Sequence, residues 1–183
     1  HGTCRRQRQM CIRDRIILGV IHLKGLPGSP SNKLNLEEIT ELAQNDIDNL
    51  SKAGVNGIIV ENFGDVPFVK NDVSKRTVAS LTSVIQNLNI DSKLKLGVNV
   101  LRNDGIAALS IAEATNADFV RINVLNNVMM FTDQGIIEGE ANKIAEFNKS
   151  LNKDIEIFAD VFVKHAVPPE GSKIENHTEE LIN

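Results

Sequence analysis

The sequence predicts an α/β fold built on a parallel β-sheet, and three observations support it. Short runs rich in Val, Ile and Phe alternate with longer segments whose apolar residues recur at helical spacing. The short runs are almost continuously apolar, which is typical of parallel strands buried on both faces. The strands begin about 35 residues apart, so eight such units would need roughly 270 residues, near the usual length of a (β/α)8 barrel.

The elements can be assigned in order along the chain. The predicted strands cover residues 16–21, 57–60, 94–100, 118–122 and 155–161. The predicted helices cover residues 36–53, 74–88, 104–114 and 139–151, and residues 175–183 begin another helix. Gly54 provides a helix-ending signal after the first helix. We interpret Met129 and Met130 as core or lid packing, because methionine fills irregular apolar gaps.

This alternation of strands and helices is compatible with two architectures, an open doubly wound sheet or a closed barrel. We favour an incomplete (β/α)8 TIM barrel, in which residues 16–183 form the N-terminal five βα units and strands 6–8 are missing. A complete five-stranded flavodoxin-like sheet is the alternative.

Residues 1–15 differ in composition from the rest of the chain. They carry five Arg and one Asp, a net charge of +4, whereas residues 16–183 carry a net charge of −8. We interpret this segment as non-native, because it resembles translated sequencing-adapter sequence; a transit peptide or a basic arm for nucleic acid are alternatives. Cys4 and Cys11 are the chain's two cysteines, so residues 16–183 cannot form a disulfide framework. That suits a reducing compartment, and we expect a cytoplasmic protein.

Composition also restricts the partners. No stretch approaches the 18 or more apolar residues that a membrane-spanning helix needs, so we expect no integral membrane segment. The chain has no Trp or Tyr and a net charge of −4, which argues against a nucleic-acid partner. A small anionic metabolite is the expected ligand, and homo-oligomer formation is possible.

Polar side chains lie at the end of every predicted strand. Ligands of parallel α/β sheets bind outside the carboxyl ends of the strands, so these side chains are the candidates for a site. In strand order they are His22; Glu61, Asn62 and Asp65; Asn99, Arg102, Asn103 and Asp104; Arg121 and Asn123; and Asp160, Lys164 and His165.

Structural roles are an alternative for several of these residues. Asn103 or Asp104 could cap the helix that follows them. Arg121 could form a structural ion pair with Glu61 or Asp160. Likewise, His22 could be a core histidine hydrogen-bonded to a neighbouring strand, and Lys164-His165 could be a solvated loop pair.

Six phrases in the same order make the sequence resemble the BtpA/SgcQ family. They are GVIHLKGLPGSP (19–30), GIIVENFGDVPF (57–68), LGVNVLRND (96–104), ADFVRINVL (117–125), TDQGIIEG (132–139) and ADVFVKHA (159–166). The resemblance implies a TIM barrel related to phosphate-binding barrels, with the last third missing. The family name comes from a protein of photosystem I biogenesis in cyanobacteria, and other members occur beside sugar-metabolism genes.

The leading hypothesis is an enzyme acting on a small phosphorylated or sugar-like metabolite by lyase, isomerase or aldolase chemistry. Asp160 or Glu61 would abstract a proton, Lys164 would stabilise an oxyanion or form a Schiff base, and His22 and His165 would shuttle protons. The expected substrate-binding residues are His22, Asn62, Asp65, Asn99, Arg102, Asn103, Arg121 and Asn123.

A metal cofactor and a non-catalytic function are two further hypotheses. The sequence assigns no cofactor, although His22, His165, Glu61 and Asp160 could together hold a divalent metal without any diagnostic spacing. The alternative function is a non-catalytic assembly or stability factor for a membrane complex such as photosystem I.

Overall fold

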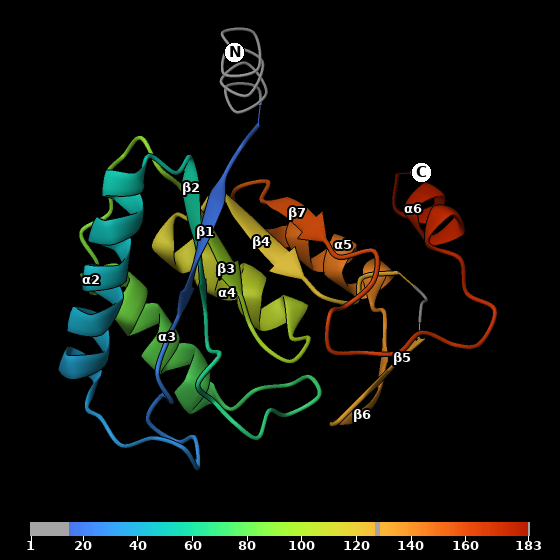
Figure 1. Cartoon of the computed structure of the whole chain (residues 1–183), viewed down its shortest axis with the longest axis horizontal. Coiled ribbons are helices and arrows are strands. Elements are labelled where there is room, and N and C mark those ends of the chain that lie inside the picture. The colour runs from blue at the N-terminus through green and yellow to red at the C-terminus, as the bar shows by residue number, and fades with distance from the viewer. Residues whose placement is uncertain (1–14, 127–128, 183) are drawn as a thin grey trace, which may run out of the picture.

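The computed structural model describes residues 15–126 and 129–182 (Figure 1). Residues 1–14, which include Cys4 and Cys11, lie outside the described residues, so the interpretation of that segment stays a prediction. The elements in chain order are β1 (Leu18–His22), α2 (Leu36–Ala53), β2 (Gly57–Glu61), α3 (Lys75–Asn87), β3 (Lys95–Asn99), α4 (Gly105–Thr115), β4 (Phe119–Ile122), β5 (Met129–Thr132), β6 (Gly135–Glu138), α5 (Ala141–Ser150), β7 (Glu156–Ala159) and α6 (Ile174–Ile182).

Five strands form one parallel sheet in the order β1-β2-β3-β4-β7, which confirms the α/β class. The strands of this sheet therefore lie side by side in the same order as in the sequence. A flavodoxin-like sheet has the order 2-1-3-4-5, so the alternative architecture is wrong. Strands of a (β/α)8 barrel also pair in the order of the sequence. The five described strands form an open sheet, however, so barrel closure stays a prediction.

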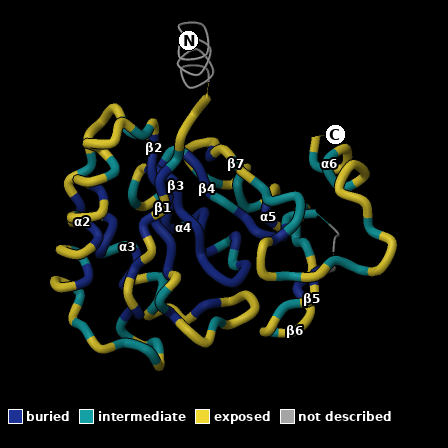
Figure 2. The backbone as a smooth tube through the Cα atoms, viewed as in Figure 1, coloured by how far each residue is buried: buried dark blue, intermediate teal, exposed yellow. Residues whose placement is uncertain are grey.

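The helices between these strands cover one face of the sheet. Parallel strands are joined by right-handed crossovers, and a strand order that advances in one direction places all the crossover helices on the same side. Accordingly, α2 packs against α3, α3 against α4, and α4 against α5 (Figure 1). Figure 2 shows that the buried backbone is concentrated in the strands and in the helix sides that face them. The main hydrophobic core lies between the two layers and includes Ile21, Ile47, Val60, Leu81, Val98, Leu109 and Val120.

Local signals at the helix ends explain why the sequence predicted them well. The Asn35 side chain accepts a hydrogen bond from the Glu38 backbone, and the Glu38 carboxylate accepts one from the Asn35 backbone, forming a capping box for α2. Gly54 ends that helix with φ 81°, a left-handed conformation that suits glycine. Ser74 caps α3 by accepting a hydrogen bond from the backbone of Thr77.

The other face of the sheet is made by the alternate residues of the same strands. Phe119 lies over Gly97 of the adjacent strand, where an added Cβ would come within 2.3 Å of the Phe119 ring. Phe119 also stacks on Phe158 with ring centroids 4.5 Å apart. Val20 and Phe158 remain partly exposed on this face. We call it the open face, because the helix layer lies on the opposite side.

Two antiparallel strands were not predicted. Here, β5 and β6 form a hairpin, and Phe131 of β5 also pairs with Val167 on its other edge through two backbone hydrogen bonds of 2.9 Å. Met130 is buried in this unit beside Val124, Ile137 and Val163, as the packing interpretation expected. The Met129 side chain is outside the described residues.

Each described helix is too short or too polar to cross a bilayer.

Candidate functional site

Four polar residues of the open face lie in one row across the sheet. His22, Glu61 and Asn99 are consecutive Cα partners at the ends of β1, β2 and β3. Arg121 continues the row on β4, because Asn99 and Arg121 directly follow a pair of partners in β3 and β4. Parallel neighbours lie about 4.8 Å apart, so the register brings side chains from four distant parts of the sequence into contact range. We call these four residues the polar row.

The carboxylate of Glu61 is the buried centre of the polar row. Its side chain is 4% exposed, with Oε1 3.0 Å from His22 Nε2 and Oε2 3.6 Å from Arg121 Nη1. Burial raises the pKa of Glu61, and the positive charges of His22, Arg121 and Arg102 offset only part of that effect. Glu61 is therefore a carboxyl group whose proton is retained to higher pH than usual, which is the property of a general acid or base.

Arg121 is held in place by Asp160, which follows β7. The guanidinium donates two hydrogen bonds to that carboxylate, 3.0 Å from Nε to Oδ1 and 2.8 Å from Nη2 to Oδ2. Asn123 Nδ2 donates a third hydrogen bond of 3.2 Å to Asp160 Oδ2. These hydrogen bonds to Asp160 raise the pKa of Arg121, so the guanidinium stays charged. The predicted ion pair exists with both Glu61 and Asp160.

Several polar atoms of this region are covered by protein yet have no hydrogen-bond partner. Asn99 is 1% exposed, and neither its Oδ1 nor its Nδ2 makes a hydrogen bond. The same holds for Glu61 Oε2 and Asn123 Oδ1. Buried polar atoms are normally hydrogen-bonded, because an unpaired one costs about 1–3 kcal/mol. Sites that carry such a cost are frequently places where a ligand supplies the missing partner.

Asn62 and Asp65, both predicted to bind substrate, connect loops in the structure. Asn62 Oδ1 accepts a hydrogen bond of 2.7 Å from the Leu101 backbone, and its Nδ2 donates one of 3.1 Å to Asp65 Oδ2. In turn, Asp65 Oδ1 accepts one of 2.7 Å from the Leu26 backbone. Burial raises the pKa of Asp65. These bonds fix the loops after β1, β2 and β3 relative to one another.

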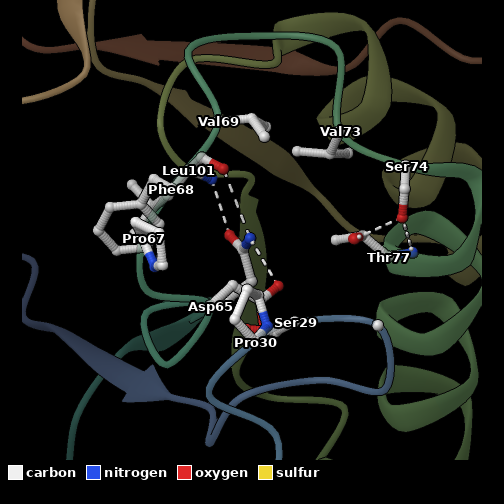
Figure 3. A pocket seen from close by; sticks show the side chains of 12 residues that line it. Ser29, Pro30, Asp65, Pro67, Phe68, Val69, Val73, Ser74, Thr77 and Leu101 are labelled. Carbon is white, nitrogen blue, oxygen red and sulfur yellow. Dashed lines mark hydrogen bonds between the residues drawn. The ribbon is translucent and has the colours of Figure 1, made fainter.

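A small cavity lies between these loops and the beginning of α3 (Figure 3). Its volume is about 110 Å³, below the ~300–1,000 Å³ of most small-molecule pockets. It is lined by Gly28, Ser29, Pro30, Asn62, Asp65, Pro67, Phe68, Val69, Val73, Ser74, Thr77 and Leu101. The cavity lies beside the loop network and is too small to hold a typical metabolite.

The three polar residues after β3 have different surroundings. Asn103 exchanges two hydrogen bonds with the Val124 backbone, 2.9 Å from Nδ2 and 2.8 Å to Oδ1. Asp104 is the N-cap of α4, which confirms the structural alternative for this residue. The guanidinium of Arg102 lies 5.8 Å from the centroid of the Phe68 ring, a cation–π contact.

Lys164 and His165 are exposed in a turn beyond β7. Within residues 15–126 and 129–182, no hydrogen bond or ion pair joins either side chain to the polar row. The described residues also contain no group of three or more His, Cys, Asp or Glu side chains arranged to hold a metal ion. The structure thus brings together His22, Glu61, Asn99, Arg121, Asn123 and Asp160 from the predicted set.

Comparison with known proteins identifies the family. The model of the BtpA family matches residues 13–183. The chain belongs to the BtpA family. An uncharacterized protein of Thermococcus kodakarensis is 52% identical over 151 residues, covering 82% of this chain and 57% of that protein. The photosystem I biogenesis protein BtpA of Synechocystis is 44% identical over 152 residues, covering 83% of this chain and 53% of that protein.

The BtpA family extends beyond these organisms. An uncharacterized mitochondrial protein of Caenorhabditis elegans is 32% identical over 170 residues, covering 88% of this chain and 60% of that protein. The chain therefore spans little more than half the length of these curated relatives. No solved structure matches it.

Two aromatic residues beside the polar row were not predicted from the sequence. Phe63 stacks on His22 with ring centroids 4.2 Å apart and an interplanar angle of 14°. At the other end, Phe158 is the Cα partner of Arg121. Phe63 lies in the turn that follows β2, so strand periodicity could not assign it to this face.

Proposed function

We propose that this chain is part of a BtpA family enzyme with a (β/α)8 barrel, which acts on a small phosphorylated or sugar-like metabolite by lyase, isomerase or aldolase chemistry. The observation that carries the proposal is the buried Glu61 carboxyl group, held between His22 and Arg121 at the carboxyl ends of parallel strands. The cytoplasmic location, the homo-oligomer and the anionic metabolite expected from the sequence belong to the same proposal.

The arrangement of the sheet supports a barrel. The strand order is sequential and the helices pack in one layer, so further βα units beyond β7 would extend the sheet in the same order. In a closed barrel the open face would become the interior, and the polar row would lie at its C-terminal end. Active sites of (β/α)8 barrels occupy that end.

The contacts suggest a division of roles. Glu61 would transfer the proton, because its raised pKa lies nearer neutral pH than that of an exposed carboxyl group. His22, with 52% of its side chain exposed and 3.0 Å from Glu61, would exchange that proton with solvent. Arg121 would stabilise developing negative charge, and Asp160 would position Arg121 through its two hydrogen bonds. The catalytic roles expected for Lys164 and His165 stay predictions.

The test replaces the carboxyl group without removing its bulk in a full-length BtpA relative. In the Synechocystis protein, the counterpart of Glu61→Gln should fold normally but fail to restore function in a strain that lacks the protein. The counterpart of the exposed Glu41→Gln, on α2, is the matched control and should restore function fully. Full restoration by the Glu61→Gln counterpart would contradict catalysis by this site.

A second candidate is a non-catalytic assembly factor for a membrane complex. The name of the Synechocystis relative favours it, as do exposed apolar side chains on the hairpin and its neighbour, Phe131, Ile136 and Val167. This candidate makes the opposite prediction in the same strain: Phe131→Ser with Ile136→Ser would abolish restoration, and Glu61→Gln would not.

A further inference from the structure

The unpaired atoms around the polar row are mainly hydrogen-bond acceptors. Three of the four are oxygens, namely Glu61 Oε2, Asn99 Oδ1 and Asn123 Oδ1, and the fourth is the donor Asn99 Nδ2. A ligand that satisfies them must therefore donate more hydrogen bonds than it accepts. Phosphate and carboxylate groups are acceptors at neutral pH, so they do not meet this requirement.

Most donors of the region are already committed. Arg121 donates Nε and Nη2 to Asp160, and its Nη1 lies 3.6 Å from Glu61 Oε2, an ion pair too long for a hydrogen bond. Asn123 Nδ2 also donates to Asp160, and His22 Nε2 lies 3.0 Å from Glu61. An anion placed here would have to displace a carboxylate from Arg121, and it would be repelled by Asp160. Arg102 adds a positive field at Glu61 but lies over the Phe68 ring, outside the row.

Apolar rings flank the polar atoms. Phe63 is 40% exposed and stacks on His22 at the β1 side of the row. Phe158 is 42% exposed and is the Cα partner of Arg121 at the β7 side. A ligand that fits this surface has hydrogen-bond donors directed at the strands and C–H groups beside the rings. Hydroxyl groups on adjacent carbons of a polyol or sugar have this combination, because each hydroxyl donates one hydrogen bond and accepts others.

Resting on the function proposed above, we propose that the polar row binds the uncharged, hydroxylated part of the ligand, with hydroxyl groups donating to Asn99 and Glu61, and that any phosphate group of the ligand lies outside the row. Asn99 is 1% exposed, so binding requires the side chains that cover it to move aside. The polar row thus favours ligand groups that donate hydrogen bonds over groups that only accept them. It would therefore bind the polyol end of a sugar phosphate.

The test follows side-chain amide resonances of the 183-residue chain by NMR, with assigned Asn99 and Asn103 signals. The probes are xylitol as a neutral polyol, inorganic phosphate, and ethylammonium as a donor without hydroxyl groups. We expect millimolar xylitol to shift the Asn99 amide signals and leave Asn103 unchanged, because Asn103 already makes two hydrogen bonds. Asn99→Leu should weaken xylitol binding at least ten-fold, whereas phosphate should leave the Asn99 signals in place.

Three outcomes would overturn the proposal. They are Asn99 shifts with phosphate at lower concentration than with xylitol, shifts with ethylammonium but not xylitol, and no shift with any probe. The wild-type titration gives this answer even if Asn99→Leu fails to fold. Each of these outcomes leaves the proposed enzyme function standing, because that proposal is judged separately by the Glu61→Gln counterpart in the full-length relative.

Discussion

Two buried asparagines at the end of the third sheet strand show how much depends on partners that are distant in sequence. Asn99 and Asn103 were both predicted to bind substrate, from the same type of evidence. In the structure Asn103 makes two hydrogen bonds with the Val124 backbone, whereas Asn99 makes none. The sequence could place both residues at the strand end, but it could not show which of them finds a partner 21 residues away.

This contrast gives an opposite expectation for two similar substitutions. Asn99→Leu should raise the free energy of unfolding by about 1–3 kcal/mol, because it removes a buried amide without partners. Asn103→Leu, the control, should lower the free energy of unfolding by a similar amount, because the Val124 backbone would lose both hydrogen bonds. Urea denaturation of the two variants measures both changes. Destabilisation by Asn99→Leu would mean that the amide is satisfied in solution.

For single elements, local sequence signals predicted the helix ends, but they did not predict the β5–β6 hairpin. The helices begin and end within one or two residues of their predicted bounds, because caps such as Gly54 and Ser74 act on the adjacent turn. The β5–β6 hairpin was missed because its two-residue turn, Asp133-Gln134, is not one of the usual hairpin dipeptides. Gly135, with φ 95°, was the available signal for a turn at this position.

Asp104 joins two elements, and its loss should affect both. Its Oδ1 accepts a hydrogen bond of 2.9 Å from Ala107 at the start of α4, and its Oδ2 accepts one of 2.8 Å from Val73 before α3. We expect Asp104→Ala to lower the free energy of unfolding by about 1–2 kcal/mol or slightly more. Asp104→Asn keeps an acceptor for the cap and should lose less. Thermal denaturation compares them; equal stability of Asp104→Ala and wild type would exclude this role.

For the whole molecule, the sequence predicted the alternation of strands and helices and the presence of polar residues at the carboxyl ends of the strands. Both depend on chain order and periodicity, which a sequence records directly. Barrel closure depends on strand pairing around a complete ring, and the described chain has β1 and β7 as the edges of its sheet. The pairing of Glu61 with both His22 and Arg121 likewise arises only when β1, β2 and β4 are assembled.

Two buried carboxyl groups, Glu61 and Asp65, should contribute less to the stability of the molecule as pH rises above about 4.5. Burial raises the pKa values of Glu61 and Asp65, so the folded state holds protons that the unfolded state has released. Their contribution is fully present below the unfolded values of 4.5 and 3.8 and is lost as pH rises through the folded values. The loss is about 1.4 kcal/mol for each unit by which a pKa is raised.

Substitution separates the share of Glu61 from that of Asp65. The free energy of unfolding of Glu61→Gln minus that of wild type should increase from pH 4.5 to neutral pH, because Gln cannot ionise and Asp65 is common to both proteins. Urea denaturation at several pH values measures this difference. A difference that is independent of pH would show that the Glu61 pKa is not raised.

We infer that polar side chains from neighbouring strands form one ligand site on the open face. The most direct measurement is a crystal structure of a full-length BtpA relative, such as the Thermococcus kodakarensis protein, soaked with a sugar phosphate. We expect electron density for the ligand over the counterparts of Glu61, Asn99 and Arg121, with hydroxyl groups directed at the first two. Ligand density elsewhere, or those three side chains directed apart in the complete protein, would contradict the claim.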